Sequence, residues 1–122
     1  MHTKPTLIIL PGWGGSHETW ADFIKPASED FDVKCIDLPC FGNEPCPSKV
    51  WGVEEYAQFI KSKIENKKSK IILLGHSFGG QVAACFAFKH PEQLKALILC
   101  GAAIIRPKNY FRRFIFGAVG KI

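Results

Sequence analysis

One serine of this chain lies among residues that favour nucleophilic chemistry. Ser77 lies in the stretch LLGHSFGGQ (residues 73–81), and residues 75–79 have the spacing GxSxG. Between a strand and a helix, this motif forms a sharp, strained turn that exposes the serine hydroxyl above the sheet, and its glycines remove side chains that would clash. The helix then directs its unpaired N–H groups and positive dipole end at the same place. The pattern predicts a nucleophile for acyl transfer; the alternative is a glycine-rich turn without chemistry.

The surrounding sequence predicts the strand and the helix that this turn requires. Runs rich in Ile, Leu and Val predict four strands, at residues 6–10, 33–38, 70–75 and 94–101. Helical stretches lie between them, at residues 17–27, 53–67 and 78–90. Three of the strands are continuously apolar, which is typical of strands covered on both faces. The alternation predicts an α/β fold with a parallel, doubly wound sheet of about four strands and flanking helices.

A second glycine-rich loop, LPGWGGS at residues 10–16, follows the first predicted strand. An acyl-transfer serine needs two N–H donors directed at the oxyanion. Phe78, the residue after the serine, would supply one backbone N–H, and Trp13, between two glycines, is best placed to supply the other. We expect the first and third strands to be neighbours, so that both loops meet at the switch point of the sheet. The alternative for Trp13 is a core aromatic side chain.

Five blocks of sequence carry a family resemblance, in this order: LPGWGGSHETW, DLPCFGNEPCP, EEYAQFI, LLGHSFGG and HPEQLKALILCGAA. Together they resemble the N-terminal half of an α/β-hydrolase of the single-domain esterase, peptidase or C–C-hydrolase kind, over about residues 5–103. The resemblance implies that Ser77 is the nucleophile and that the backbone N–H groups of Trp13 and Phe78 form the oxyanion hole. It also implies a small-molecule substrate.

Two positions depart from the family's pattern. Pro11 precedes Gly12 where the family usually has histidine, and Cys40 replaces a common glycine before Phe41. Neither change removes a catalytic atom, but both affect the expected substrate pocket, in which we place Phe41, His76 and Gly12.

The chain does not supply an obvious base for the serine. A serine hydroxyl needs a general base that is oriented by a carboxylate, and in this fold the order is Ser, then Asp or Glu, then His. After Ser77 the sequence offers only His90 and Glu92, at the end of the helix that starts at the serine. His17 is a less favoured substitute base, and Asp37 is expected to hydrogen-bond its own loop.

These observations predict an incomplete α/β-hydrolase core. We assign residues 1–103 to the N-terminal half of the core and residues 104–122 to the start of a lid or connecting helix. The expected function is acyl transfer on an ester, thioester or amide, nearly inactive without the C-terminal half of the same protein. The alternative is a non-catalytic hydrolase-fold binding protein or a truncated product.

Charge and composition bear on partners and cofactors. Residues 1–60 carry 4 Lys and Arg against 9 Asp and Glu, whereas residues 61–122 carry 12 against 2. Most of these lysines suit a helix C-terminus, so we expect no nucleic-acid partner. Residues 107–122 could form an amphipathic helix on a membrane surface, although a lid or packing helix is the favoured interpretation. No phosphate-binding, metal-binding or redox motif is evident, and we expect neither a cofactor nor a metal.

The five cysteines are an odd number without CxxC spacing. Three lie in apolar runs and are expected to be small buried hydrophobic residues: Cys35, Cys85 and Cys100. Cys40 and Cys46 flank a loop and could form a disulfide or bind a metal, but no histidine lies near them. We therefore expect free thiols in a reducing cytoplasm.

Overall fold

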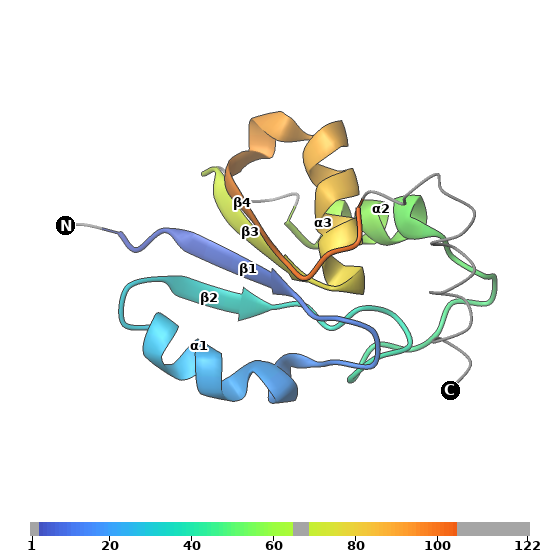
Figure 1. Cartoon of the computed structure of the whole chain (residues 1–122), viewed down its shortest axis with the longest axis horizontal. Coiled ribbons are helices and arrows are strands. Elements are labelled where there is room, and N and C mark those ends of the chain that lie inside the picture. Colours follow the sequence, from blue (N-terminus) through green and yellow to red (C-terminus); the bar gives the residue numbers. More distant parts are fainter. Residues whose placement is uncertain (1–2, 65–68, 105–122) are drawn as a thin grey trace, which may run out of the picture.

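Four parallel strands form one sheet in the order β2-β1-β3-β4 (Figure 1). The computed structural model describes residues 3–64 and 69–104. The strands are β1 (Thr6–Leu10), β2 (Asp32–Cys35), β3 (Ile71–His76) and β4 (Leu94–Cys100). The helices are η1 (His17–Trp20), α1 (Ala21–Ala27), α2 (Val53–Ile64), α3 (Phe78–Lys89) and η2 (Pro91–Gln93). The predicted fold class, including neighbouring first and third strands, is confirmed.

Helices cover the sheet on both faces. Alternate residues of a strand point to opposite sides, so each strand contributes side chains to both layers of the core. In β1, Ile8 and Leu10 belong to the core beneath α2 and α3, whereas Leu7 and Ile9 pack towards Trp20 and Ile24. Figure 1 shows α1 on the opposite side of the sheet from α2 and α3. This two-sided burial explains the continuous apolar runs.

The second strand is shorter than the sequence predicted. It ends at Cys35, not at residue 38, because β1 stops at Leu10 before a proline. The last bond of the pair runs from the Ile36 N–H to the Ile9 carbonyl, at 3.0 Å. The chain then turns towards the first loop, where Asp37 has its hydrogen-bond partners.

The helix α2 buries four residues that lie on one face at helical spacing: Tyr56, Ala57, Ile60 and Ile64. The expected continuation of this helix to residue 67 lies outside the described residues. The expected lid or membrane-surface segment at residues 104–122 also lies outside them, apart from Ile104.

Candidate functional site

Ser77 occupies a strained turn between β3 and α3. Its backbone has φ 52° and ψ −116°, in a region that residues other than glycine rarely adopt, and the residue is exposed. The Ser77 N–H donates to the Cys100 carbonyl at 2.9 Å, which ties the turn to the end of β4. The Ser77 carbonyl accepts from the Gly80 N–H at 3.0 Å and thereby begins α3. The hydroxyl therefore lies at the surface, outside the core.

The glycines of the motif allow α3 to approach the sheet closely. A Cβ on Gly75 would lie 2.5 Å from the Gly79 carbonyl oxygen and 2.6 Å from the Gly80 Cα. A Cβ on Gly79 would collide with the carbonyl groups of Leu10 and Pro11. The N-terminus of α3 thus lies against both β3 and the end of β1.

The loop after β1 lies beside Ser77. A Cβ on Gly12 would be 3.3 Å from the Ser77 Cβ and 3.0 Å from the His76 Nδ1. The Gly15 N–H donates to the Gly12 carbonyl at 2.9 Å, which makes the loop a tight turn. The two glycine-rich loops therefore meet, as the predicted strand order requires.

Trp13 is 71% exposed, so it is not a core aromatic side chain. Its ring centroid lies 4.7 Å from that of Phe41 and 5.4 Å from that of Phe78, both in edge-to-face geometry. Phe78 in turn packs on Tyr56, at 5.2 Å. These four residues form the aromatic cluster, which includes Phe78, the residue that directly follows Ser77. Of them, Phe41 and Tyr56 are buried.

The other expected pocket residues, Gly12 and His76, line a hollow next to Trp13. The His76 ring lies 5.9 Å from Trp20, and both line a hollow of about 440 Å³ together with Gly12 and Trp13. Ser77 is not among the residues that line this hollow. All three predicted pocket residues thus lie near Trp13. Phe41 contacts its ring in the aromatic cluster, and Gly12 and His76 line the hollow that Trp13 also lines.

Asp37 connects the loops that follow β1 and β2. Its Oδ1 accepts the His17 backbone N–H at 2.8 Å, and its Oδ2 contacts the His17 Nδ1 at 2.8 Å and accepts the Asn43 N–H at 3.2 Å. Partial burial raises the pKa of Asp37, but the hydrogen bonds from His17 and Asn43 outweigh it, and the pKa falls below its ordinary value. The predicted bond to its own loop is present; the bonds to His17 were not foreseen. Within its own loop, Asp37 is approached closely by Gly42, where a Cβ would collide with the carboxylate.

No histidine donates to or accepts from the Ser77 hydroxyl within residues 3–64 and 69–104. The Nδ1 of His17 is bound to Asp37. His90 lies at the end of α3, as expected, where its ring lies 5.1 Å from that of Phe86 and its Nδ1 is 3.8 Å from Glu92.

The cysteine prediction was wrong for one pair. Cys40 and Cys46 form a disulfide, with Cα atoms 4.3 Å apart, across the loop that carries Phe41. The absence of a nearby histidine argued against a metal but not against a disulfide, which requires only proximity of the two cysteines. The other three are free and partly buried rather than fully buried. Burial and the Asp37 charge raise the pKa of Cys35 to about 12. The cytoplasmic location stays a prediction.

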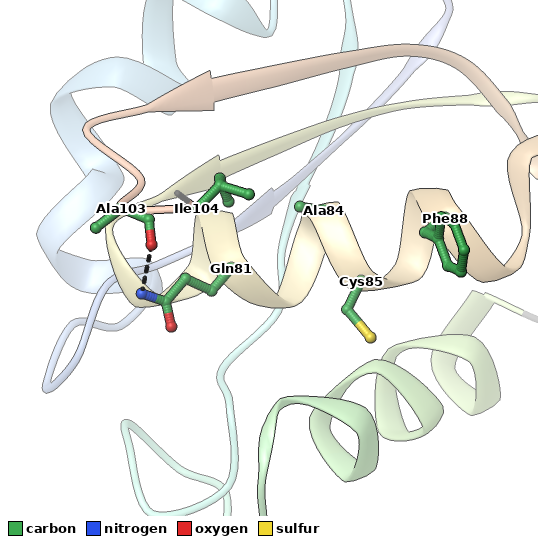
Figure 2. A pocket seen from close by; sticks show the side chains of 6 residues that line it. All are labelled: Gln81, Ala84, Cys85, Phe88, Ala103 and Ile104. Atoms are coloured by element: carbon green, nitrogen blue, oxygen red, sulfur yellow. Dashed lines mark hydrogen bonds between the residues drawn. The ribbon is translucent and has the colours of Figure 1, made fainter. Parts of the chain in front are cut away.

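A second hollow lies along α3, between this helix and the chain that follows β4. Figure 2 shows Gln81, Cys85 and Phe88 along this helix and Ala103 and Ile104 beyond the end of β4. Its volume is about 340 Å³, and the Gln81 Nε2 donates to the Ala103 carbonyl at 3.3 Å. Phe88 is 88% exposed.

The strand β4 also has exposed apolar side chains. Leu97, Ile98 and Leu99 are between 37% and 42% exposed, and β4 is the outermost strand beside β3. Within the described ranges, none of the helices has the length and apolar character to cross a membrane. In the same part of the chain, His, Cys, Asp and Glu side chains form no group of three that could hold a metal ion.

The sequence matches a family model described as the alpha/beta hydrolase fold, over residues 5–117. It is 35% identical over 99 residues to a pimeloyl-[acyl-carrier protein] methyl ester esterase of Aeromonas hydrophila, covering 77% of this chain and 36% of that protein. It is 34% identical over 108 residues to a 1-acylglycerol-3-phosphate O-acyltransferase of Arabidopsis thaliana, covering 81% of this chain and 25% of that protein.

Among solved structures, the fold is similar to the crystal structure of a membrane phospholipase A described as a bacterial virulence factor. The TM-score is 0.82 and the identity 30%, over 93% of this chain and 38% of that chain. This chain thus spans between a quarter and about two fifths of the length of these three proteins.

Proposed function

Because the chain belongs to the alpha/beta hydrolase fold family, whose matched members here include an esterase and a phospholipase, we propose that it acts by acyl transfer through Ser77. The substrate class is an ester, thioester or amide. The observation that carries the proposal is the exposed Ser77 at φ 52°, on a turn between β3 and α3. Strain of this kind costs about 1–3 kcal/mol and persists where the surrounding structure imposes it. Here the contacts at Gly75 and Gly79 do so.

The oxyanion of the tetrahedral intermediate would bind the backbone N–H groups of Trp13 and Phe78. Phe78 is the first residue of α3, so its N–H is free of the helix's own hydrogen bonds and lies at the positive end of the dipole. The closeness of Gly12 to Ser77 supports Trp13 as the second donor. One such donor contributes about 10²–10³ in kcat in serine hydrolases.

The aromatic cluster supports an apolar acyl group as the part of the substrate nearest the serine. Trp13 is largely exposed and is held edge-on by Phe41 and Phe78, so its ring offers apolar surface at low entropic cost. The esterase and phospholipase relatives agree with such an acyl group.

The general base and its carboxylate would come from polypeptide beyond the described residues. This part of the proposal rests on two observations: the exposed apolar β4 and the fraction of the relatives' length that the chain spans. An open apolar strand edge invites pairing, and a further parallel strand and helix of the same hydrolase fold would cover both β4 and the hollow of Figure 2. The 122 residues alone would then lack a base, a loss of about 10⁶ in kcat.

A non-catalytic hydrolase-fold binding protein is the alternative. The observation that favours it is that no histidine is hydrogen-bonded to the Ser77 hydroxyl in the described ranges. In that case, the only role of the serine turn would be to let α3 pack closely against the sheet.

A fluorophosphonate probe distinguishes the two. The reading frame beyond Ile122 is first examined for an Asp and a later His, and the complete chain is then labelled. We expect labelling that Ser77→Ala abolishes and that the control Ser62→Ala, on the exposed face of α2, leaves unchanged. A complete chain with Asp and His that resists labelling would support the binding protein instead.

A further inference from the structure

The Asp37 carboxylate holds together two loops that are far apart in the sequence. It receives the His17 backbone N–H and ring Nδ1 from the chain that follows the first glycine-rich loop. It also receives the Asn43 N–H from its own loop. The Asp37 side chain is only 10% exposed, whereas that of His17 is 44% exposed. A partly buried carboxylate with this many donors is a fixed acceptor rather than a solvated surface charge.

The same two loops carry the rings that face each other beside Ser77. Trp13 lies four residues before His17, and Phe41 lies between Asp37 and Asn43. The Trp13 and Phe41 rings are 4.7 Å apart. The relative position of these rings therefore depends on the Asp37 contacts, which join the backbones on either side.

The loop after β2 has little freedom to adjust. Gly42 has φ 57° and approaches the Asp37 carboxylate so closely that a Cβ would collide with it. The Cys40–Cys46 disulfide closes the same loop. Because the loop after β2 is fixed in this way, Asp37 has a fixed position. Its bonds to His17 therefore also fix the position of the first glycine-rich loop.

We propose that Asp37 and His17 are positioning residues that hold the first glycine-rich loop, and with it the Trp13 N–H, in the geometry needed to bind an oxyanion. The proposal rests on the proposed function, because the oxyanion in question is that of the acyl-transfer intermediate at Ser77. The lowered pKa of Asp37 agrees with it, since the pair stays charge-assisted at neutral pH.

The imidazole gives the proposal a spectroscopic signature. With the Asp37 Oδ2 2.8 Å from His17 Nδ1, a proton must reside on Nδ1, which leaves Nε2 as the acceptor in the neutral ring. Nitrogen-15 shifts of the His17 ring should therefore report the Nδ1–H tautomer. Asp37→Asn should abolish this preference, whereas an unbonded ring in the wild-type chain would overturn the proposal.

Loop order is the second measurement, made by ¹⁵N relaxation on the 122-residue chain. In His17→Ala and Asp37→Asn, order parameters of residues 12–16 should fall from about 0.85 towards 0.6 or below, while those of β3 stay unchanged. His17→Asn should restore the loop, because the asparagine amide can donate from near the Nδ1 position. Glu44→Gln is the matched control: it removes a carboxylate of the same loop that pairs with Lys63 and does not contact the first loop. Unchanged order at residues 12–16, or an equal loss in β3, would overturn the proposal.

The third measurement links position to chemistry in the complete chain. In His17→Ala, the maximal rate of Ser77 phosphonylation should fall about tenfold or more with little change in the half-saturating probe concentration, and His17→Asn should recover it. A rate that does not change while the loop loosens would overturn the role in oxyanion binding. Failure of the wild-type chain to label at all, with the loop effects present, would instead count against the proposed function.

Discussion

The close approach of α3 to β3 can be tested by adding one methyl group at Gly75. In Gly75→Ala, the new Cβ would lie 2.5 Å from the Gly79 carbonyl oxygen, 2.6 Å from the Gly80 Cα and 2.8 Å from the Ala83 Cβ. All three atoms belong to α3, and two of them are backbone, so no side chain can rotate away. For the first contact to reach the ordinary range above 3.4 Å, the helix must retreat by roughly 1 Å.

That displacement affects the whole buried face of the helix. Val82, Ala83 and Phe86 are 0% exposed, and a gap of about 0.5–1 Å forfeits a quarter to a half of the dispersion attraction across it. Overpacking in a core costs about 1–3 kcal/mol, and the rigid partners here place Gly75→Ala at the upper end, near 3 kcal/mol. This is a large fraction of the roughly 5–15 kcal/mol that stabilises a domain.

Urea unfolding followed by tryptophan fluorescence measures the change in the free energy of unfolding. Gly52→Ala is the matched control, since its new Cβ would meet only the Glu55 Oε2, at 3.1 Å. This side-chain oxygen accepts the Gly52 N–H at 2.8 Å and needs to shift by only a few tenths of an ångström. We expect its free energy of unfolding to lie within about 1 kcal/mol of wild type. A Gly75→Ala value as small as that of the control would show that α3 does not lie tightly against β3, and the structural basis for the strained Ser77 would be lost.

Three further predictions concern the core, the carboxylate and the disulfide. Phe86→Ala should lower the free energy of unfolding by about 3–5 kcal/mol, because the ring is 0% exposed; a loss below about 1 kcal/mol in urea unfolding would contradict that burial. The lowered pKa of Asp37 stabilises the fold above its ordinary pKa of 3.8, and this contribution is lost as pH falls through the folded-state pKa. Thermal melts between about pH 5 and pH 2 should therefore lose less stability in Asp37→Asn than in wild type, and parallel curves would argue against the assignment. Reduction of Cys40–Cys46, which are six residues apart, should cost about 2 kcal/mol by the chain-entropy relation, and reductant should leave the melt of the Cys40→Ser/Cys46→Ser variant unchanged.

The order of elements and the serine turn could be predicted from the sequence because their signals are local. The spacing of glycines around Ser77 restricts the backbone over a few residues, and the apolar runs report burial on both faces of each strand. The parallel sheet and the meeting of the two glycine-rich loops followed from these local patterns. The roles of Ser77, Trp13 and Phe78 in chemistry stay predictions.

Contacts between loops were harder to predict. The pairing of Asp37 with His17 spans 20 residues, and neither residue type indicates its partner. The Cys40–Cys46 disulfide was wrongly discounted because composition suggested free thiols, whereas the bond depends on how closely the loop brings the two Cα atoms together. The end of β2 at Cys35 was set by the length of β1, its neighbour in the sheet.

The sequence by itself determined the strands, the helices and the strained bend at Ser77, since backbone sterics and hydrophobic periodicity act over a few neighbouring residues. Only the tertiary structure decided that Trp13 is exposed against Phe41 and that the two loops are joined through Asp37. The reason is physical: a side chain's exposure and partners depend on which segments the sheet order brings together, and this is a property of the whole fold.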